Sequence, residues 1–336
     1  MTYFCYEPTA QGPNLEQLKE IRAFVLEHQS FYLLGHREPD GDCVGSQLAL
    51  ASLLRRLGKD VFCLQDGPFD RPETEPFAQA FLQTTTKATA QPVATIVLDC
   101  STPERVSERY QSLLAYPLLV IDHHLAGKPF GEIAYIDPSA SATTQLLLDI
   151  FTALDQRPNP SEAGLLFFGL VTDTGFFRHC DGNSPRTFHT AFYLTRCGAS
   201  VKDTYQLVYG NRDFNQRKLL GKLLAKAESL FSGRLIICSQ SEEDKQIGGP
   251  NNRSSDELYS LLQTVKGVEV IVLLRQEKVG LVSVGLRATN SFDVAAIASA
   301  HGGGGHRLAA GFNFYGSLQA ARTLIEDIFA PLFADH

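Results

Sequence analysis

The sequence predicts an α/β protein of two domains, the first of which is built on a parallel sheet. Over residues 1–190, short apolar runs rich in β-branched residues alternate with segments of helical periodicity, which is the rhythm of βαβ units. Strand-like runs dominate after Gly233, and 336 residues exceed what one hydrophobic core usually serves. We therefore expect a parallel-sheet domain at 1–190, a helical linker at 191–232 and a smaller α/β domain at 233–336.

The elements of the first domain follow from its hydrophobic periodicity. Apolar residues at helical spacing predict an amphipathic helix over residues 14–29. Apolar runs predict strands at 31–34, 60–64, 94–98 and 117–121, and helical patterns predict helices at 44–57, 103–114 and 141–154. Glycine, proline and threonine clusters indicate that residues 65–91 form a loop with one short helix. The segment 165–171 is apolar enough for either a helix or a buried strand.

The second half of the chain changes from helical to strand-like texture. Residues 184–231 are mostly helical and more charged, and the middle of this segment is expected to connect the domains. Strands are predicted at 234–238, 268–275 and 278–286, with a helix at 255–263 and a final helix after Ser317.

The composition indicates a globular protein. At 44% hydrophobic and 20% charged residues it is neither disordered nor fibrous. The net charge of −7 argues against a broad basic surface for long duplex nucleic acid, and no uncharged apolar run reaches membrane-spanning length. The first residues lack a basic segment followed by a long apolar one, so a secretory signal is not expected.

Side chains that can bind a metal follow four apolar segments at the point where each segment ends. They are His36, Asp40 and Asp42 after residues 31–34, Asp99 after 94–98, Asp122, His123 and His124 after 117–121, and Asp173 after 165–171. Open α/β sheets bind ligands at the carboxyl ends of strands, and imidazole with carboxylate suits Mn²⁺, Fe²⁺, Mg²⁺ or Zn²⁺. Each group alone is explained as a turn or a helix cap. All four together predict a metal site, because buried carboxylates without a cation are costly.

The seven cysteines are scattered without C-x-x-C pairs. An odd, unpatterned set predicts reduced thiols and a cytoplasmic protein, and it argues against a structural zinc site. Cys43 and Cys100 adjoin candidate metal ligands, where they are either outer-sphere neighbours or small buried fillers. The second role is the usual one for a free cysteine.

The order of the candidate ligands resembles the four motifs of the DHH phosphoesterase superfamily, whose third motif is matched by Asp122-His123-His124. Residues 302–311, which read Gly-Gly-Gly-Gly-His-Arg-Leu-Ala-Ala-Gly, resemble the glycine-rich signature of the DHH-associated C-terminal domain. The two matches bracket nearly the whole chain. The resemblance therefore implies a metal-binding catalytic domain at 1–190 and a substrate-binding domain at 233–336.

The resemblance also implies a hydrolytic site with two divalent cations, for which Mn²⁺ is the favoured ion. Carried over residue by residue, one ion is held by His36 and Asp40, the other by Asp42, His123 and Asp173, and both by Asp99. Two such ions activate a water molecule and clamp phosphate oxygens. His124 would contact phosphate or protonate the leaving oxygen, and Asp122 would orient an imidazole. A core histidine is the alternative for His124, and Glu38 between the ligands is expected to face solvent.

The glycine-rich segment is the expected substrate-binding site. Gly303, Gly304 and Gly305 permit close backbone approach, so that their amides can surround an anion. His306 and Arg287 would bind phosphate or stack on a base. The competing interpretations are a flexible linker for the glycines and a surface charge for Arg287.

The superfamily group with this compact layout comprises nanoRNases and phosphatases of 3′-phosphoadenosine 5′-phosphate (pAp). The resemblance thus implies hydrolysis of short 5′-phosphorylated oligonucleotides, including pNpN dinucleotides, to mononucleotides, with pAp as a further substrate. Two alternatives stay open: a phosphodiesterase of cyclic di-AMP or another cyclic dinucleotide, and a non-catalytic nucleotide sensor. No long duplex and no membrane is expected as a partner, and a homodimer is expected by analogy alone.

Overall fold

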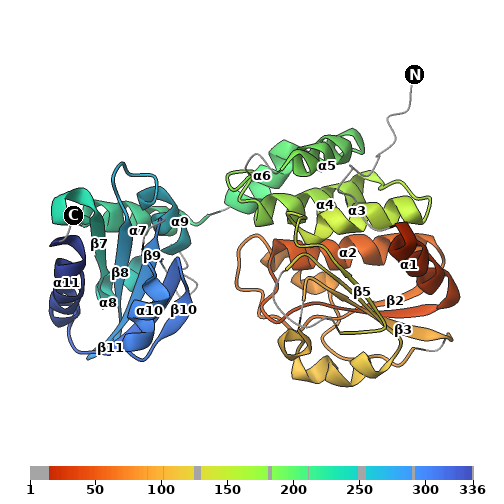
Figure 1. Cartoon of the computed structure of the whole chain (residues 1–336), viewed down its shortest axis with the longest axis horizontal. Helices are drawn as coiled ribbons and strands as arrows, with labels where there is room; N and C mark the ends of the chain where they lie inside the picture. The colour runs from red at the N-terminus through yellow and green to blue at the C-terminus, as the bar shows by residue number, and fades with distance from the viewer. Residues whose placement is uncertain are drawn as a thin grey trace. The chain divides into compact units, whose positions relative to one another are not determined.

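The computed structural model describes residues 15–88, 90–100, 102–124, 130–180, 184–210, 212–248, 255–289 and 292–334. The chain divides into two compact units, Met1–Asn211 and Arg212–His336 (Figure 1). Each unit has its own sheet and its own hydrophobic core, so the predicted α/β class is confirmed. Residues 191–232, expected as a linker, are shared between the two units.

The first unit is built on a five-stranded parallel sheet with the order β2-β1-β3-β4-β5. Its strands are β1 Ser30–Leu34, β2 Asp60–Cys63, β3 Val93–Leu98, β4 Leu118–Asp122 and β5 Ile133–Ile136. Every residue of β1, β3 and β4 is buried, which explains why these strands read as continuous apolar runs. The prediction missed β5, which is short and mostly half-buried.

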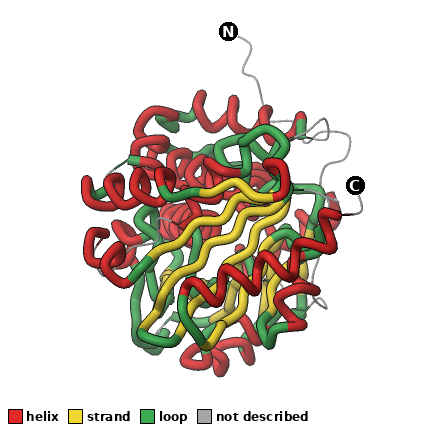
Figure 2. The backbone as a smooth tube through the Cα atoms, turned by 90° about the vertical axis from the view of Figure 1, so that its left-hand side faces the viewer, coloured by secondary structure: helices red, strands yellow, loops and turns green. Residues whose placement is uncertain are grey.

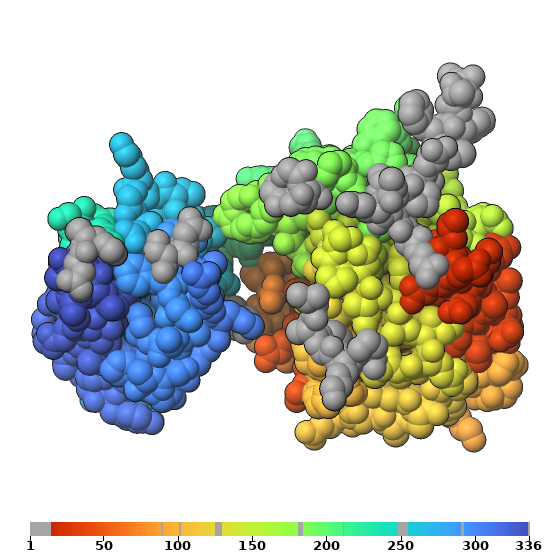
Figure 3. Space-filling view, in the orientation of Figure 1, coloured from red at the N-terminus to blue at the C-terminus, as the bar shows by residue number. Residues whose placement is uncertain are grey.

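One face of this sheet is covered by α1 Leu15–Glu27, α2 Gly41–Arg56, α3 Thr143–Ala153 and α4 Pro160–Asp173, and the other by η3 Glu108–Ala115, which follows η2 Pro103–Arg105 (Figure 1). Helices α5 Pro185–Arg196 and α6 Val201–Tyr209 pack on α4. The 3-10 segment η1 Glu75–Ala80 lies on the side of the helices, where Phe77 packs against Phe168 of α4. Phe31 and Leu33 of β1 share a core with α2, α3 and α4, whereas Tyr32 and Leu34 share one with η3. In the space-filling view, η2 and η3 form the gold lower surface of this unit (Figure 3).

Helices α2 and α4 cross at short range because glycines lie at the contact. A Cβ atom on Gly45 of α2 would lie 2.6 Å from the carbonyl oxygen of Leu165. One on Gly169 of α4 would lie 2.4 Å from Thr144 Cγ2 and 2.8 Å from Asp42 Oδ1. Protein interiors are close-packed and leave no room for such overlaps, so both positions require glycine. This crossing fixes Asp42 against α4, the helix that ends at Asp173.

The apolar segment 165–171 lies inside α4, so Asp173 ends a helix and not a strand. The helix begins at Pro160 because Asn159 and Glu162 form a capping box, in which each side chain accepts a hydrogen bond of 2.9 Å from the other residue's amide. The predicted helix over 103–114 is two 3-10 segments. They are separated because Val106 and Ser107 are extended, with ψ of 140° and 138°.

The second unit is built on a six-stranded mixed sheet with the order β10-β11-β9-β8-β7-β6, in which only β7 and β8 are parallel neighbours. Its strands are β6 Glu228–Leu230, β7 Leu235–Gln240, β8 Val270–Lys278, β9 Leu281–Ala288, β10 Gly304–His306 and β11 Ala309–Tyr315. Its helices are α7 Phe214–Ala225, α8 Glu242–Gly248, α9 Ser255–Leu262, α10 Val294–Ala300 and α11 Leu318–Ala334, with a 3-10 turn η4 at Phe231–Gly233.

Helix α11 lies across one face of this sheet (Figure 2), and with α10 it closes one core. Helices α7 and α9 contribute to a second core on the other face. The prediction missed α8, α10, β6, β10 and β11, which are short apart from β11. Among the described helices, none is long and apolar enough to span a membrane. The six described cysteines are free thiols, and Cys5 lies outside the described residues.

Candidate metal centre

The turn between β1 and α2 presents His36, Asp40 and Asp42. Asp40 is the N-cap of α2, where its carboxylate accepts a hydrogen bond of 3.1 Å from the Cys43 amide. Capping leaves the same oxygen, Oδ1, 3.7 Å from Nε2 of His36, which is almost fully buried. The cap therefore serves to hold a carboxylate beside the imidazole. Glu38 in the same turn is exposed, as expected.

Asp99 follows β3 in a left-handed backbone conformation, with φ of 57°. Such a conformation is uncommon outside glycine and persists only where the surroundings hold it. Here the Asp99 amide donates to the Ile121 carbonyl at 3.0 Å, and Asp99 Oδ1 accepts from Thr143 Oγ1 at 3.1 Å. The buried carboxylate lies between two imidazoles, with Oδ2 3.5 Å from His36 Nε2 and Oδ1 3.7 Å from His123 Nε2.

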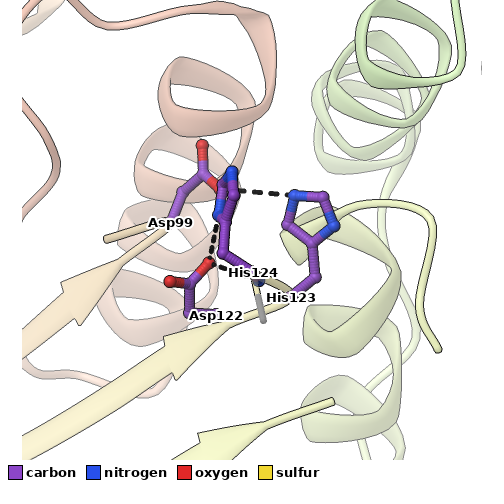
Figure 4. Close-up of side chains that lie close together, drawn as sticks. All are labelled: Asp99, Asp122, His123 and His124. Carbon is purple, nitrogen blue, oxygen red and sulfur yellow. Dashed lines mark hydrogen bonds and ion pairs between the residues drawn. The ribbon is translucent and has the colours of Figure 1, made fainter. Parts of the chain in front are cut away.

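The end of β4 supplies Asp122, His123 and His124 (Figure 4). Asp122 Oδ1 accepts hydrogen bonds from the His124 amide at 3.2 Å and from His124 Nδ1 at 2.7 Å. The His124 side chain is 38% exposed and its Nδ1 lies 3.6 Å from Asp99 Oδ1. His123 turns its ring toward Asp99 (Figure 4), with the two imidazole centroids 4.4 Å apart. Of the two rings, His124 is the one that solvent reaches more easily.

Asp42 and Asp173 complete the surroundings of His123, whose Nε2 lies 3.1 Å from Asp173 Oδ2 and 3.9 Å from Asp42 Oδ2. Asp42 is fully buried, and its two oxygens accept hydrogen bonds from the first two amides of α3, Thr143 at 2.5 Å and Thr144 at 2.9 Å. The N-terminus of a helix is a natural anion site. Sequence reasoning missed these two threonines, although it placed the start of a helix beside them.

The concentration of buried carboxylates shifts several pKa values. Burial, followed by the charges of Asp99 and Asp173, raises the pKa of Asp42 well above its usual range. Burial lowers the pKa of His123, but the carboxylates of Asp173, Asp42 and Asp99 outweigh it and raise the pKa to about 10. Burial is likewise outweighed at His36, whose pKa rises beside its thiol and carboxylate neighbours. The cluster therefore favours positive charge at its centre.

The arrangement fits divalent cations. Nδ1 of His36 lies 2.7 Å from the Arg37 carbonyl oxygen and Nδ1 of His123 lies 3.3 Å from that of Ala140, so each Nδ1–H donates to the backbone, and the neutral form of each ring has its lone pair on Nε2. Neither Nε2 atom has a hydrogen-bond partner among the described residues. Their separations of 3.5 and 3.7 Å from Asp99 are long for hydrogen bonds but suit two ligands of one ion, each at roughly 2.0–2.2 Å.

The structure contains three groups of candidate metal ligands, and within each group the ligand atoms lie within 4.8 Å of one another. They are Asp99, Asp122, His123 and His124; His36, Cys43 and Asp99; and Asp42, His123 and Asp173. Asp99 belongs to the first and second groups and His123 to the first and third, so the three groups form one continuous centre. The sequence had predicted Cys43 to be either an outer-sphere neighbour or, as is usual, a buried filler, and had not included its sulfur among the ligands.

The predicted substrate-binding residues belong to the second unit. His306 of β10 pairs with Ala309 of β11, which pairs with Arg287 of β9, so these residues form one row across three strands. Side chains in such a row share one face of the sheet. The guanidinium carbon of Arg287 lies 4.5 Å from the centre of the Tyr259 ring, and His306 is exposed. Arg287 is therefore held in place and not a loose surface charge.

The glycines lie beside this row. Gly304, Gly311 and Gly285 form a second row on the same face, two residues along each strand. A Cβ atom on Gly303 would lie 2.2 Å from the Gly311 carbonyl oxygen, and Gly305 has φ of 143°, so both positions require glycine. The flexible-linker interpretation is wrong for Gly304 and Gly305, which belong to β10.

Two family models match the chain. Residues 30–170 match the DHH family, N-terminal domain, and residues 238–330 match the DHHA1 domain. The chain is 30% identical over 318 residues to the bifunctional oligoribonuclease and PAP phosphatase NrnA of Thermus thermophilus, with 91% of each protein covered. It is 25% identical to the protein of the same name from Bacillus subtilis, with 91% of this chain and 96% of that one covered.

A further relative is longer than this chain. The cyclic-di-AMP phosphodiesterase GdpP of Geobacillus thermodenitrificans is 26% identical, and the match covers 85% of this chain but 45% of that protein. Among solved structures, an exopolyphosphatase-related protein from Bacteroides fragilis matches with a TM-score of 0.80 at 22% identity, over 96% of this chain and 98% of that one. At that identity the likeness concerns the fold alone.

Proposed function

The chain belongs to the DHH family of phosphoester hydrolases, and we propose that it uses two Mn²⁺ ions to hydrolyse short 5′-phosphorylated oligonucleotides to mononucleotides. Its substrates are nanoRNA and pNpN dinucleotides, with pAp as a further substrate. The observation that carries the catalytic part is the Asp99 carboxylate, whose two oxygens face Nε2 of His36 and of His123. The choice of substrate is supported by similarity over almost the full length of two NrnA proteins.

In this proposal, His36 and Asp40 hold one cation, Asp42, His123 and Asp173 hold the other, and Asp99 contacts both. When bound, the two ions would supply Lewis acidity and a nucleophilic water molecule at neutral pH. The carbonyls of Arg37 and Ala140 keep each histidine in the tautomer whose Nε2 can bind a metal. The amides of Thr143 and Thr144 fix the Asp42 carboxylate.

His124 and Asp122 act on the substrate side of the proposed centre. The hydrogen bond that His124 Nδ1 donates to Asp122 raises the pKa of His124, which favours the protonated imidazole. With Nδ1 engaged, the partly exposed ring can donate from Nε2 to a phosphate oxygen or protonate the leaving oxygen. Asp122 is thus a positioning residue, and His124 is the proposed general acid.

The second unit binds the substrate in this proposal. Arg287, stacked over Tyr259, and His306 in the same row contact phosphate or base, while Gly303, Gly304 and Gly305 allow the backbone to approach closely. A guanidinium that is already ordered loses less entropy when it binds phosphate.

A second candidate is hydrolysis of cyclic di-AMP, favoured by the 26% identity to GdpP over 85% of this chain. We rank this function second because that identity is lower than the 30% shared with the NrnA protein of Thermus thermophilus. A nucleotide sensor, the third alternative, would bind these ligands without turnover.

One competition experiment tests all three. The full chain is incubated with Mn²⁺ and equimolar pApA, a five-residue RNA, a long RNA, cyclic di-AMP and pAp, and each is followed by chromatography. Preferential loss of pApA and the short RNA, with mononucleotides as products, is expected. Preferential loss of cyclic di-AMP would replace the first proposal with the second, and the absence of any turnover would contradict both.

A further inference from the structure

Cys43 lies at the metal centre and not merely near it. Its sulfur, an imidazole nitrogen of His36 and a carboxylate oxygen of Asp99 lie within 4.8 Å of one another. The cysteine is the third residue of α2, and its amide donates to Asp40 Oδ1 at 3.1 Å. His36 and Asp99, two of the residues proposed to hold the first cation, therefore lie beside this thiol.

The fold builds a place for the sulfur. A Cβ atom on Gly35 would lie 2.3 Å from Cys43 Sγ, so the sulfur occupies the space that a side chain at position 35 would fill. Cys43 is fully buried, and its polar contacts are long: Gln47 Oε1 at 3.6 Å and Gln65 Nε2 at 4.0 Å. The thiol is therefore fixed in position by packing, but its hydrogen bonds with neighbouring side chains are long and weak.

An independent observation at the same place indicates a site for a cation. His36 is 4% exposed, and its Nε2 has no hydrogen-bond partner among the residues that the structure describes. Its Nδ1 is engaged by the Arg37 carbonyl at 2.7 Å, so Nε2 is the nitrogen that faces the cluster containing the sulfur.

Cys100 provides the contrast within the same chain. It directly follows Asp99 and is also fully buried, but its Sγ donates to the Thr102 carbonyl oxygen at 3.2 Å. It belongs to none of the candidate ligand groups among the described residues. Proximity to a ligand in sequence is thus not enough to bring a sulfur to the centre.

We propose that Cys43 is a thiolate ligand of the cation held by His36, Asp40 and Asp99, and that it gives this position a preference for thiophilic divalent ions over Mn²⁺. The inference rests on the metal positions of the proposed function. Nitrogen, oxygen and sulfur donors together suit Zn²⁺, Co²⁺ or Cd²⁺. A site made of carboxylates and imidazole alone, by contrast, suits Mn²⁺ as well as it suits those ions. As the sulfur–metal bond forms, the S–H bond breaks and its proton leaves to solvent.

The test uses the full chain freed of metal with a chelator and titrated with Co²⁺, whose thiolate complexes show a sulfur-to-cobalt charge-transfer band in the near ultraviolet. We expect this band in the wild type and in the matched control Cys100→Ser, and its loss in Cys43→Ser. Calorimetry should show that Cys43→Ser weakens Cd²⁺ binding on the order of 10-fold or more relative to Mn²⁺, since even outer-shell changes cost that much.

Absence of the band in the wild type is decisive by itself, so the inference can be overturned without relying on the folding of a variant. Absence of the band in wild-type protein that binds Co²⁺, or its persistence in Cys43→Ser, would overturn the inference. Cys43→Ala, which adds no polar atom, replaces the serine variant if circular dichroism shows that the latter is unfolded. A missing band together with normal Mn²⁺-dependent turnover would remove the role of Cys43 and leave the proposed function intact.

Discussion

Asp99 is the residue on which the proposed chemistry depends most. It is 1% exposed, its backbone is in the left-handed region, and its two oxygens face different histidines. These features have a cost in stability, because a strained, buried carboxylate is unfavourable without a compensating partner. A shared metal ligand is a role that would offset that cost.

Replacement of Asp99 by asparagine should therefore abolish catalysis without unfolding the chain. The side chain keeps its shape but loses the charge that the proposed cations need, so we expect turnover of pApA to fall by about 10³-fold, as when a major electrostatic group is removed. Melting followed by circular dichroism reports folding. Asp60→Asn, on an exposed residue of β2, is the matched control and should keep full activity. Wild-type rates in Asp99→Asn would exclude the two-metal scheme.

At the residue scale, the sequence predicted part of the candidate site. It predicted that His36, Asp99 and His123 lie together because each follows an apolar run, and the structure brings them together. Their role as ligands remains a prediction. The hydrogen bonds from the Thr143 and Thr144 amides to Asp42 could not be predicted, because the sequence of a helix start does not show which carboxylate it will face.

At the scale of elements, the crossing of α2 and α4 positions the proposed ligands Asp42 and Asp173. Gly169→Ala should disturb it, since the added methyl would lie 2.8 Å from Asp42 Oδ1. We expect destabilisation of about 1–3 kcal/mol, as for other overpacked cores, together with weaker Mn²⁺ binding. Chemical denaturation and calorimetry measure the two effects.

Gly164→Ala is the internal control for that experiment. It lies in the same helix, but a Cβ there would meet nothing within 4 Å. Alanine favours a helix over glycine by about 1 kcal/mol, so this variant should be as stable as the wild type or more stable. Equal effects of both substitutions would show that the crossing does not position Asp42.

In the second unit, Asp244 ties α8 to α7 through Lys222 Nζ at 2.6 Å and Lys226 Nζ at 2.7 Å. Burial opposes ionisation of Asp244, but both lysines and the Ser241 amide lower its pKa below the ordinary 3.8. Because the pKa of Asp244 is lower in the folded protein than in the unfolded chain, its ionised carboxylate stabilises the fold at pH values above the unfolded-state pKa. This stabilisation is lost as the pH falls below about 4.

Asp244→Asn should therefore destabilise the protein by about 2 kcal/mol at neutral pH, with a smaller difference from the wild type at acid pH. Denaturant titrations at several pH values measure this. Glu243→Gln, at the exposed neighbouring position, should change little. A difference that does not shrink on acidification would contradict the assigned role of the ion pairs.

The elements that the sequence predicted best are those whose burial is uniform. β1, β3 and β4 were found because every residue in them is buried. The segment 165–171 was ambiguous for the same reason: α4 is buried over most of its length, so it lacks a polar face. Its capping box at Asn159 and Glu162 was the signal that resolves the ambiguity.

At the scale of the whole molecule, the two units have separate cores, and the proposed metal ligands all belong to the first. Metal should accordingly stabilise one unit more than the other. We expect addition of Mn²⁺ to raise the melting transition of the first unit, by mass action on the folded state, and a chelator to reverse the shift. Hydrogen exchange resolved by peptide measures this, and equal protection of both units would contradict it.

The fold class could be predicted because the change from helical to strand-like hydrophobic periodicity at Gly233 involves many residues. The second unit begins at Arg212 and not at 233, because α7 packs with β7 and α9 around Leu219 and Leu223. The sequence of α7 has a helical pattern and several charged residues, and these features do not show which of the two sheets the helix covers.

The central claim is that Asp99 joins two cations into one centre, and the electron paramagnetic resonance spectrum of the full chain titrated with Mn²⁺ tests it most directly. We predict two Mn²⁺ bound per chain with the spectrum of a spin-coupled pair, and loss of the coupling in Asp99→Asn. Binding of a single Mn²⁺, or of two ions whose spectra are independent of each other, would contradict the account.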